Sequence, residues 1–316
     1  MANADGHIAS STTRIAIAAV AVLGNLLILV VVARNRNLRR SGANILLAQL
    51  AFADIVIGIG TGTRGVSAIV FGSSGQKSFH RATCIILGFP TILGIHLSQT
   101  TMVAIALDRL FSIRFPVLYR RMETVAFGML RFFVCCLYSI FGSCLPLFGL
   151  MSPDPIPVCS IGLAALPWFS SYWIFFSSVL TIFIFVLYTA IYFIFTRRRT
   201  ASVGKSAAQK TITVTITAIL VSYFFLYCIP NLSILVVNIT GVTPLWVSLT
   251  SLVTGIGSGL NAAGNVFIYG WKHSELRAAM KRVPFLRHLI FCHEKTVTVA
   301  TVTPVSAARI NSKMYS

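Results

Sequence analysis

Long apolar segments separated by short polar runs make up most of this chain. Seven such segments can be read, at approximately residues 15–33, 43–70, 82–113, 125–151, 167–195, 211–237 and 244–270. A helix needs about 20 apolar residues to cross the hydrocarbon core of a bilayer, and these segments are close to or above that length. A membrane β-barrel would instead show shorter segments of alternating polarity. The pattern therefore predicts an all-α membrane protein, a bundle of seven transmembrane helices.

Composition agrees with a membrane protein. Of the 316 residues, 56% are hydrophobic and 10% are charged, whereas soluble domains have about 25% charged residues. The net charge of +19 raises the question of a nucleic-acid partner. The basic residues, however, lie in short runs between apolar segments, so we expect contact with a lipid membrane and none with nucleic acid.

The basic runs also predict an orientation. Lys and Arg are concentrated after the first, third, fifth and seventh segments, and the opposite side has only Arg14, Arg64, Lys77 and Arg81. Since inner loops carry the excess of positive charge, we expect an extracellular N-terminus and a cytoplasmic C-terminus. The first basic residue is Arg14. We therefore expect no cleavable signal peptide, and we expect the first span to act as the insertion signal.

The third apolar segment carries the strongest motif. It starts at Cys84, contains no charged residue from Ile85 to Leu107, and ends in Asp108-Arg109. Pro116-Val117-Leu118-Tyr119 follows. An acid–base pair at a helix end alone is often only a solvated ion pair, but here it occurs together with the distant cysteine and the later proline and tyrosine.

This stretch resembles the third helix and second inner loop of rhodopsin-like G-protein-coupled receptors. Leu110 after the arginine and the Asn-Ile-Leu-Leu run that begins at Asn44 are most similar to the nematode serpentine chemoreceptors, class SX. The resemblance implies that Arg109 acts in coupling and that Asp108 holds it in the resting state. It implies roles in coupling and activation for Asp108, Arg109, Tyr119, Tyr188, Asn265 and Tyr269.

Two cysteines are expected on the outer side. Cys84 lies where the family keeps its third-helix cysteine, and Cys159 ends a proline-rich segment that is too rich in proline to be helical. Because both face the oxidising side, the resemblance implies a disulfide between them that pins the second outer loop over the third span. The cysteines inside the spans are interpreted as packing residues.

Asp54 is a carboxylate inside the second span, which marks a candidate functional site. The resemblance implies an allosteric sodium site formed by Asp54, Ser98, Asn261 and Asn265, whose oxygen atoms suit a hard cation. A hydrogen-bonded cluster that holds the helices together fits the same residues. No other cofactor is expected.

The ligand pocket is expected in the outer half of the bundle, at Thr91, His96, Gln99, Asn231 and Trp246. His96 is an ionisable side chain in mid-span, although a buried histidine bonded to a neighbouring helix is an equal alternative. Thr91 stands where amine receptors have a carboxylate, so a biogenic amine is disfavoured and an odorant-like small molecule is favoured.

Several family features are missing. Cys228 stands where the family has a tryptophan before Pro230, no proline follows Asn265, and the fourth span has no interior tryptophan. These departures put the usual aromatic switch and the usual kink of the seventh helix in doubt. Pro230 itself should kink the sixth helix.

The domain organisation follows from these segments. We expect a short extracellular N-terminus (1–14), a seven-helix receptor domain (15–270), an amphipathic juxtamembrane helix (271–291) and a flexible cytosolic tail (292–316).

The predicted function is a G-protein-coupled chemosensory receptor in the plasma membrane, with a heterotrimeric G protein as partner. The alternatives are a peptide receptor, an orphan seven-helix receptor that no longer couples, and a ligand-gated channel. One buried histidine and one buried aspartate do not supply an enzyme's catalytic set, so no enzyme is expected.

Overall fold

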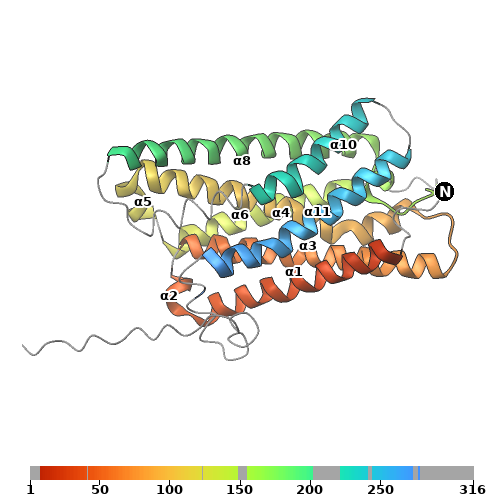
Figure 1. The fold of residues 1–316 in the computed structure, drawn as a ribbon, viewed down its shortest axis with the longest axis horizontal. Helices are drawn as coiled ribbons and strands as arrows, with labels where there is room; N and C mark the ends of the chain where they lie inside the picture. Colours follow the sequence, from red (N-terminus) through yellow and green to blue (C-terminus); the bar gives the residue numbers. More distant parts are fainter. Residues whose placement is uncertain are drawn as a thin grey trace, which may run out of the picture.

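The computed structural model describes residues 8–40, 42–122, 124–148, 155–201, 221–240, 244–272 and 277. The long helices run side by side along one axis (Figure 1). The elements are α1 (Ile8–Arg34), α2 (Arg36–Arg39), α3 (Gly42–Ser73), α4 (Arg81–Arg114), α5 (Pro116–Met122), α6 (Val125–Cys144), η2 (Leu145–Leu147), α7 (Ile161–Ala164), α8 (Pro167–Ala201), η3 (Phe224–Cys228), α10 (Ile229–Thr240) and α11 (Pro244–Lys272).

The predicted class, an all-α bundle of seven transmembrane helices, is confirmed. Among the described residues, five helices (α1, α3, α4, α6 and α8) are long and apolar enough to cross a membrane. A shorter apolar helix at Val221–Val237 is the sixth span, and α11 is the seventh. A helix satisfies its backbone polar groups internally, as the bilayer requires of a spanning segment.

The centre of the bundle is formed by α3 and α4. Helix α3 packs along α1 on one side and α4 on the other, and α4 also contacts α6 and α8. Helix α11 packs against α1 and α3. The outer faces of α6 and α8 leave large apolar side chains such as Phe133, Phe141 and Phe175 exposed, which suits contact with lipid.

Glycines allow α3 and α4 to approach closely. A Cβ atom at Gly94 of α4 would lie 2.7 Å from the backbone nitrogen of Ile57, and one at Gly60 of α3 would collide with Thr91. Small residues at helix crossings let backbones pack closely in membranes, where water does not drive helices together. This close crossing sets the position of the helix that carries both Thr91 and Asp108.

The structure adds details at three boundaries. Helix α1 begins at Ile8, ahead of the predicted start at 15, and the Thr12 hydroxyl donates to the Ile8 carbonyl there. Helix α6 ends at Cys144, and a 3₁₀ turn containing Pro146 follows. Before Pro230 the sixth span widens into the single π-helical turn η3 rather than continuing as a regular α-helix.

Some predicted segments lie outside the described residues. These are residues 1–7 of the predicted N-terminal segment, the part of the sixth span before residue 221, and the tail at 292–316. Of the predicted amphipathic helix at 271–291, only the end of α11 and residue 277 are described.

Candidate functional site

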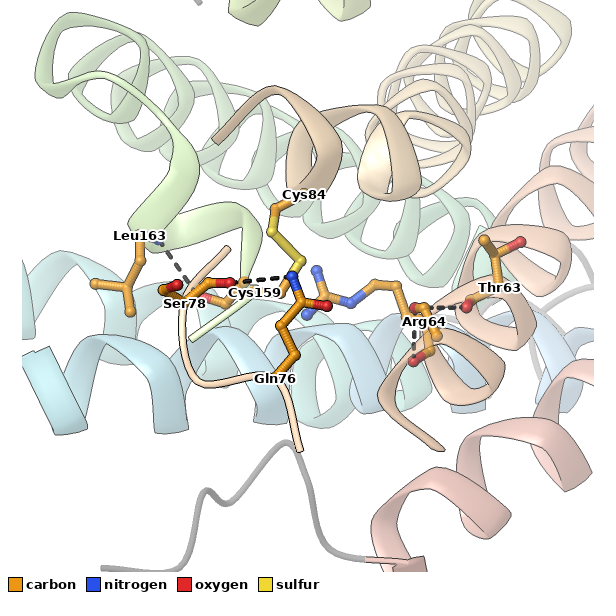
Figure 2. The surroundings of a disulfide bond; sticks show 9 residues. Thr63, Arg64, Gln76, Ser78, Cys84, Cys159 and Leu163 are labelled. Carbon is orange, nitrogen blue, oxygen red and sulfur yellow. Dashed lines mark hydrogen bonds between the residues drawn. A yellow bond between two sulfur atoms is a disulfide. The ribbon is translucent and has the colours of Figure 1, made fainter. Parts of the chain in front are cut away.

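The disulfide between Cys84 and Cys159 is confirmed, with the two Cα atoms 5.3 Å apart. Phe79 and Ile156 form an antiparallel bridge beside it, with reciprocal backbone hydrogen bonds of 3.0 and 2.9 Å. Figure 2 shows the bond joining the first turn of α4 to the segment before α7. These contacts hold the segment of Cys159 over the start of α4. This end of the bundle is called the disulfide end below.

A cavity of about 100 Å³ lies within the bundle towards the disulfide end, and it is called the deep cavity below. Helices α3, α4, α7, α8, α10 and α11 all contribute to its wall. The wall includes Thr91, Ile95, Phe169, Trp173, Ile234 and Thr254. A mainly apolar cavity with a few polar side chains is the usual form of a small-molecule site.

Of the residues predicted for the ligand pocket, Thr91 lines the deep cavity. His96, Gln99 and Asn231 are buried side chains that are not part of its wall. Trp246 is 52% exposed and also does not line it. Phe169 and Trp173 of α8 supply the aromatic surface instead.

His96 is enclosed by aromatic rings. The ring centroids of Trp173 and Phe176 lie 5.1 and 5.0 Å from that of His96, and those of Tyr138 and Tyr172 lie 6.2 Å away. Neither ring nitrogen of His96 has a hydrogen-bond partner within the described part of the chain. His96 therefore packs against Trp173, and Trp173 itself lines the deep cavity.

Gln99 and Asn231 meet in a polar network instead. The Gln99 amide donates to the Ser177 hydroxyl at 3.3 Å, and Ser177 donates to Asn231 Oδ1 at 3.2 Å. The Tyr227 hydroxyl lies 3.2 Å from Ser177 Oγ, and Asn231 Nδ2 donates to the Tyr227 carbonyl. Ser177 thus links α4 and α8 to the π-helical turn and α10, just where Pro230 interrupts the sixth span.

The predicted sodium-site residues are partly brought together. Asn265 donates to Asp54 Oδ2 at 2.9 Å, so α3 and α11 are joined at the centre of the bundle. Asp54 Oδ1 is buried without a hydrogen-bond partner among the described residues, which leaves one carboxylate oxygen available to a cation. Asn261 accepts from Ser222 at 3.3 Å, and Ser98 is buried on α4. The donor set is compatible with a hard cation such as sodium.

At the opposite end of α4, Asp108 is the hub of a second cluster. Its side chain is 1% exposed and accepts hydrogen bonds from Tyr119 at 3.0 Å and from Arg131 of α6 at 2.5 Å. Arg109 makes a longer ion pair, with its Nε 3.9 Å from Asp108 Oδ2, and its side chain is 35% exposed. The guanidinium of Arg131 also lies over the Phe127 ring, 4.8 Å from its centroid. Asp108 is therefore bonded more closely by Arg131 than by its neighbour Arg109.

The remaining residues predicted for activation are placed as follows. Tyr188 of α8 is 1% exposed and belongs to the main hydrophobic core, where Tyr223 and Ala106 also lie. Tyr269 is part of α11, and nothing is described of its side chain. The structure thus joins Asp108 to Tyr119 directly, and it joins Asn265 to Asp54 rather than to the Asp108 cluster.

Seven spanning helices, a disulfide over one end of the third span, and Asp-Arg at its other end define the class of rhodopsin-like seven-transmembrane receptors. The model of the serpentine type seven-transmembrane GPCR chemoreceptor family Srsx matches residues 18–283, and the chain belongs to this family. The predicted resemblance is confirmed.

Mammalian receptors are also similar to this chain. Adenosine receptor A3 of Ovis aries is 29% identical over 138 residues, which are 44% of this chain and 42% of that receptor. The same receptor of Canis lupus familiaris is 31% identical over 141 residues, with the same coverage. Alpha-1A adrenergic receptor of Oryctolagus cuniculus is 29% identical over 134 residues, 42% of this chain and 28% of that receptor. The matches span less than half the length of these curated relatives.

Two residues at these sites were missed by the sequence reasoning. Arg131 lies within the fourth span and had the signal of a basic residue in an apolar segment, which usually marks a buried partner. Ser177 had a weaker signal, because serine is frequent in membrane helices and commonly bonds its own backbone.

Proposed function

We propose that the protein is a chemosensory receptor that couples a small molecule in the deep cavity to a heterotrimeric G protein at the Asp108 end. The observation that carries the proposal is that one helix, α4, provides Thr91 to the cavity wall and Asp108-Arg109 at its other end. Membership of the Srsx family supports it.

The proposed orientation places the disulfide end outside the cell, in the plasma membrane. Disulfides persist on the oxidising side of a membrane, which favours that side for Cys84 and Cys159. The excess of Lys and Arg at the other end favours the cytoplasm for that end and for the C-terminus, with the N-terminus extracellular.

The proposed mechanism is a shift between two populations. A ligand that contacts Trp173 of α8 and Ile234 of α10 more favourably in one conformation stabilises that conformation. Ser177 and Asn231 transmit the change, because they bond α8 to α10 next to the π-helical turn. Movement of the sixth span then opens the Asp108 end, where the partly exposed Arg109 contacts the G protein.

Sodium is the proposed allosteric modulator. Asp54 would hold it through the oxygen that has no protein partner in the described chain, with Ser98, Asn261 and Asn265 as further oxygen ligands. When bound, the ion would neutralise the buried carboxylate and favour the resting arrangement of α3 and α11.

The proposal is tested by measuring G-protein activation in cells that express the wild type, Arg109→Ala or Arg121→Ala, across an odorant panel. Arg121 is the matched control, because it is an exposed arginine of α5 at the same end. We expect the wild type to respond to at least one odorant. At equal surface expression, Arg109→Ala should abolish this response and Arg121→Ala should retain it. A ligand-dependent ion current that Arg109→Ala leaves unchanged would contradict the proposal and favour a channel.

A further inference from the structure

We propose that the ligand is a small organic anion, a carboxylate with an apolar body, and that Arg64 of α3 binds its charge. This inference rests on the proposed function and names the ligand class of the same cavity.

Arg64 lines two cavities. It lines the deep cavity, and it also lines a second cavity of about 80 Å³ beneath the disulfide, together with Arg14, Cys84 and Cys159. Figure 2 shows its side chain extending from α3 towards the disulfide. Arg64 therefore belongs both to the wall beneath the disulfide and to the wall that contains Trp173. Among the described residues that line the deep cavity, Arg64 is the one with a charged side chain.

The electrostatic balance of this end favours anions. Its segments hold the cations Arg14, Arg64, Lys77 and Arg81, and the only acids in the same segments of the sequence are Asp5 and Asp154. Even with each acid paired to one of these cations, the end stays positively charged. A guanidinium has five N–H donors, so Arg64 can hold a neighbouring group and a ligand at the same time. A positive potential at a cavity mouth raises the local concentration of anions and repels amines.

The guanidinium of Arg64 can bind both oxygens of a carboxylate. Two parallel N–H donors of an arginine match the two acceptor oxygens of that group. Thr91 contributes to the wall of the same cavity, but its hydroxyl oxygen is buried against Gly60 at the crossing of α3 and α4.

The rest of the wall suits an apolar body. Ile92, Ile95, Phe169 and Trp173 surround the space beyond Thr91. The small volume favours a short aliphatic or single-ring acid over a peptide. An amide or ester of the same shape would fill the apolar part but would not bring the negative charge that the Arg64 guanidinium attracts.

The experiment measures thermal unfolding of the purified full-length receptor in lipid nanodiscs, without a G protein. The probes are octanoate, benzoate and phenylacetate, each beside its amide, at about 1 mM. We expect the carboxylates to raise the midpoint temperature of wild type and the amides to raise it little. Arg64→Gln should require about 10- to 100-fold more carboxylate for the same shift, because a charge-assisted hydrogen bond is lost.

Controls separate a loss of binding from a loss of folding. Lys77→Gln removes the same charge from an exposed residue at the same end that lines neither cavity, and it should behave as wild type. Arg64→Lys keeps the charge without the forked geometry, and should keep the preference for acids over amides with weaker binding. Arg109→Ala should also keep it, because Arg109 lies at the far end of α4.

Equal shifts with acids and amides, a carboxylate shift retained in Arg64→Gln, or no shift with any of the three acids would each overturn the inference. None of these outcomes contradicts the proposed function, because that proposal is tested by Arg109→Ala in the cell assay. A receptor that neutral odorants activate through Arg109, without any carboxylate shift, would keep the function and refute the ligand class.

Discussion

Arg131 is the side chain whose removal tests most directly how the Asp108 end is held in the resting state. Its charge lies 2.5 Å from the buried Asp108 carboxylate, whereas Arg109 Nε lies 3.9 Å away. We predict that Arg131→Met lowers the stability of the receptor. Breaking a buried ion pair by removing one partner costs about 3–5 kcal/mol. Because Arg131 is 18% exposed, and Tyr119 and Arg109 still face the carboxylate, we expect about 2–3 kcal/mol here.

The same substitution should reduce signalling. Without Arg131, Asp108 attracts Arg109 more strongly and holds it away from the G protein. A gain of about 1 kcal/mol in that contact changes the ratio of resting to active receptor about 5-fold. We therefore expect basal and agonist-driven G-protein activation by Arg131→Met to fall about 5-fold at equal surface expression. Asp108→Asn should do the opposite, because it releases both arginines.

The assay combines thermal unfolding of purified receptor with G-protein activation in cells. Arg121→Met is the matched control, since it removes an exposed arginine from the same end. In the double variant Asp108→Asn, Arg131→Met, the effect of Arg131→Met on signalling should disappear, because its target charge is absent. Unchanged stability together with unchanged or raised basal signalling in Arg131→Met would refute the reasoning.

Four further predictions follow from the helix contacts. Gly60→Ala should cost about 1–3 kcal/mol in thermal unfolding through overpacking against α4, whereas Gly72→Ala, with open space around it, should cost little. Ser177→Ala should lower stability by about 1–3 kcal/mol and change basal signalling, because it leaves buried amides without a partner. Cys159→Ser should cost about 2–5 kcal/mol and remove the sensitivity of unfolding to reductant. Exchange of sodium for N-methylglucamine should alter agonist affinity in wild type and leave it unchanged in Asp54→Asn; equal sodium dependence in both would contradict the sodium site.

The elements along the chain could be predicted because a bilayer demands long apolar helices. The pairing of Cys84 with Cys159 could be expected from the family resemblance, which the residues around Cys84 carry. The structure confirms the disulfide. These features depend on length, polarity and position along the chain, which a sequence displays directly.

Contacts between helices could be predicted less well, because they depend on how each helix is rotated about its axis. Successive residues of a helix differ by about 100° in direction, so a small error in rotation exchanges lipid-facing and buried positions. Trp246 was expected in the ligand pocket but is half exposed, whereas Trp173 lines the deep cavity. The pairing of Arg131 with Asp108 likewise required the relative placement of α4 and α6.

The central claim is that a ligand in the deep cavity controls a G protein at the opposite end of α4. Its most direct test is nucleotide exchange by a purified heterotrimeric G protein with the receptor in nanodiscs, with and without an agonist found in the cell screen. The account predicts nucleotide exchange that depends on the agonist. Arg109→Ala should abolish this exchange while agonist binding remains. Trp173→Ala should require a higher agonist concentration for the same exchange. Agonist binding without any exchange, or exchange that is unaffected by Arg109→Ala, would contradict it.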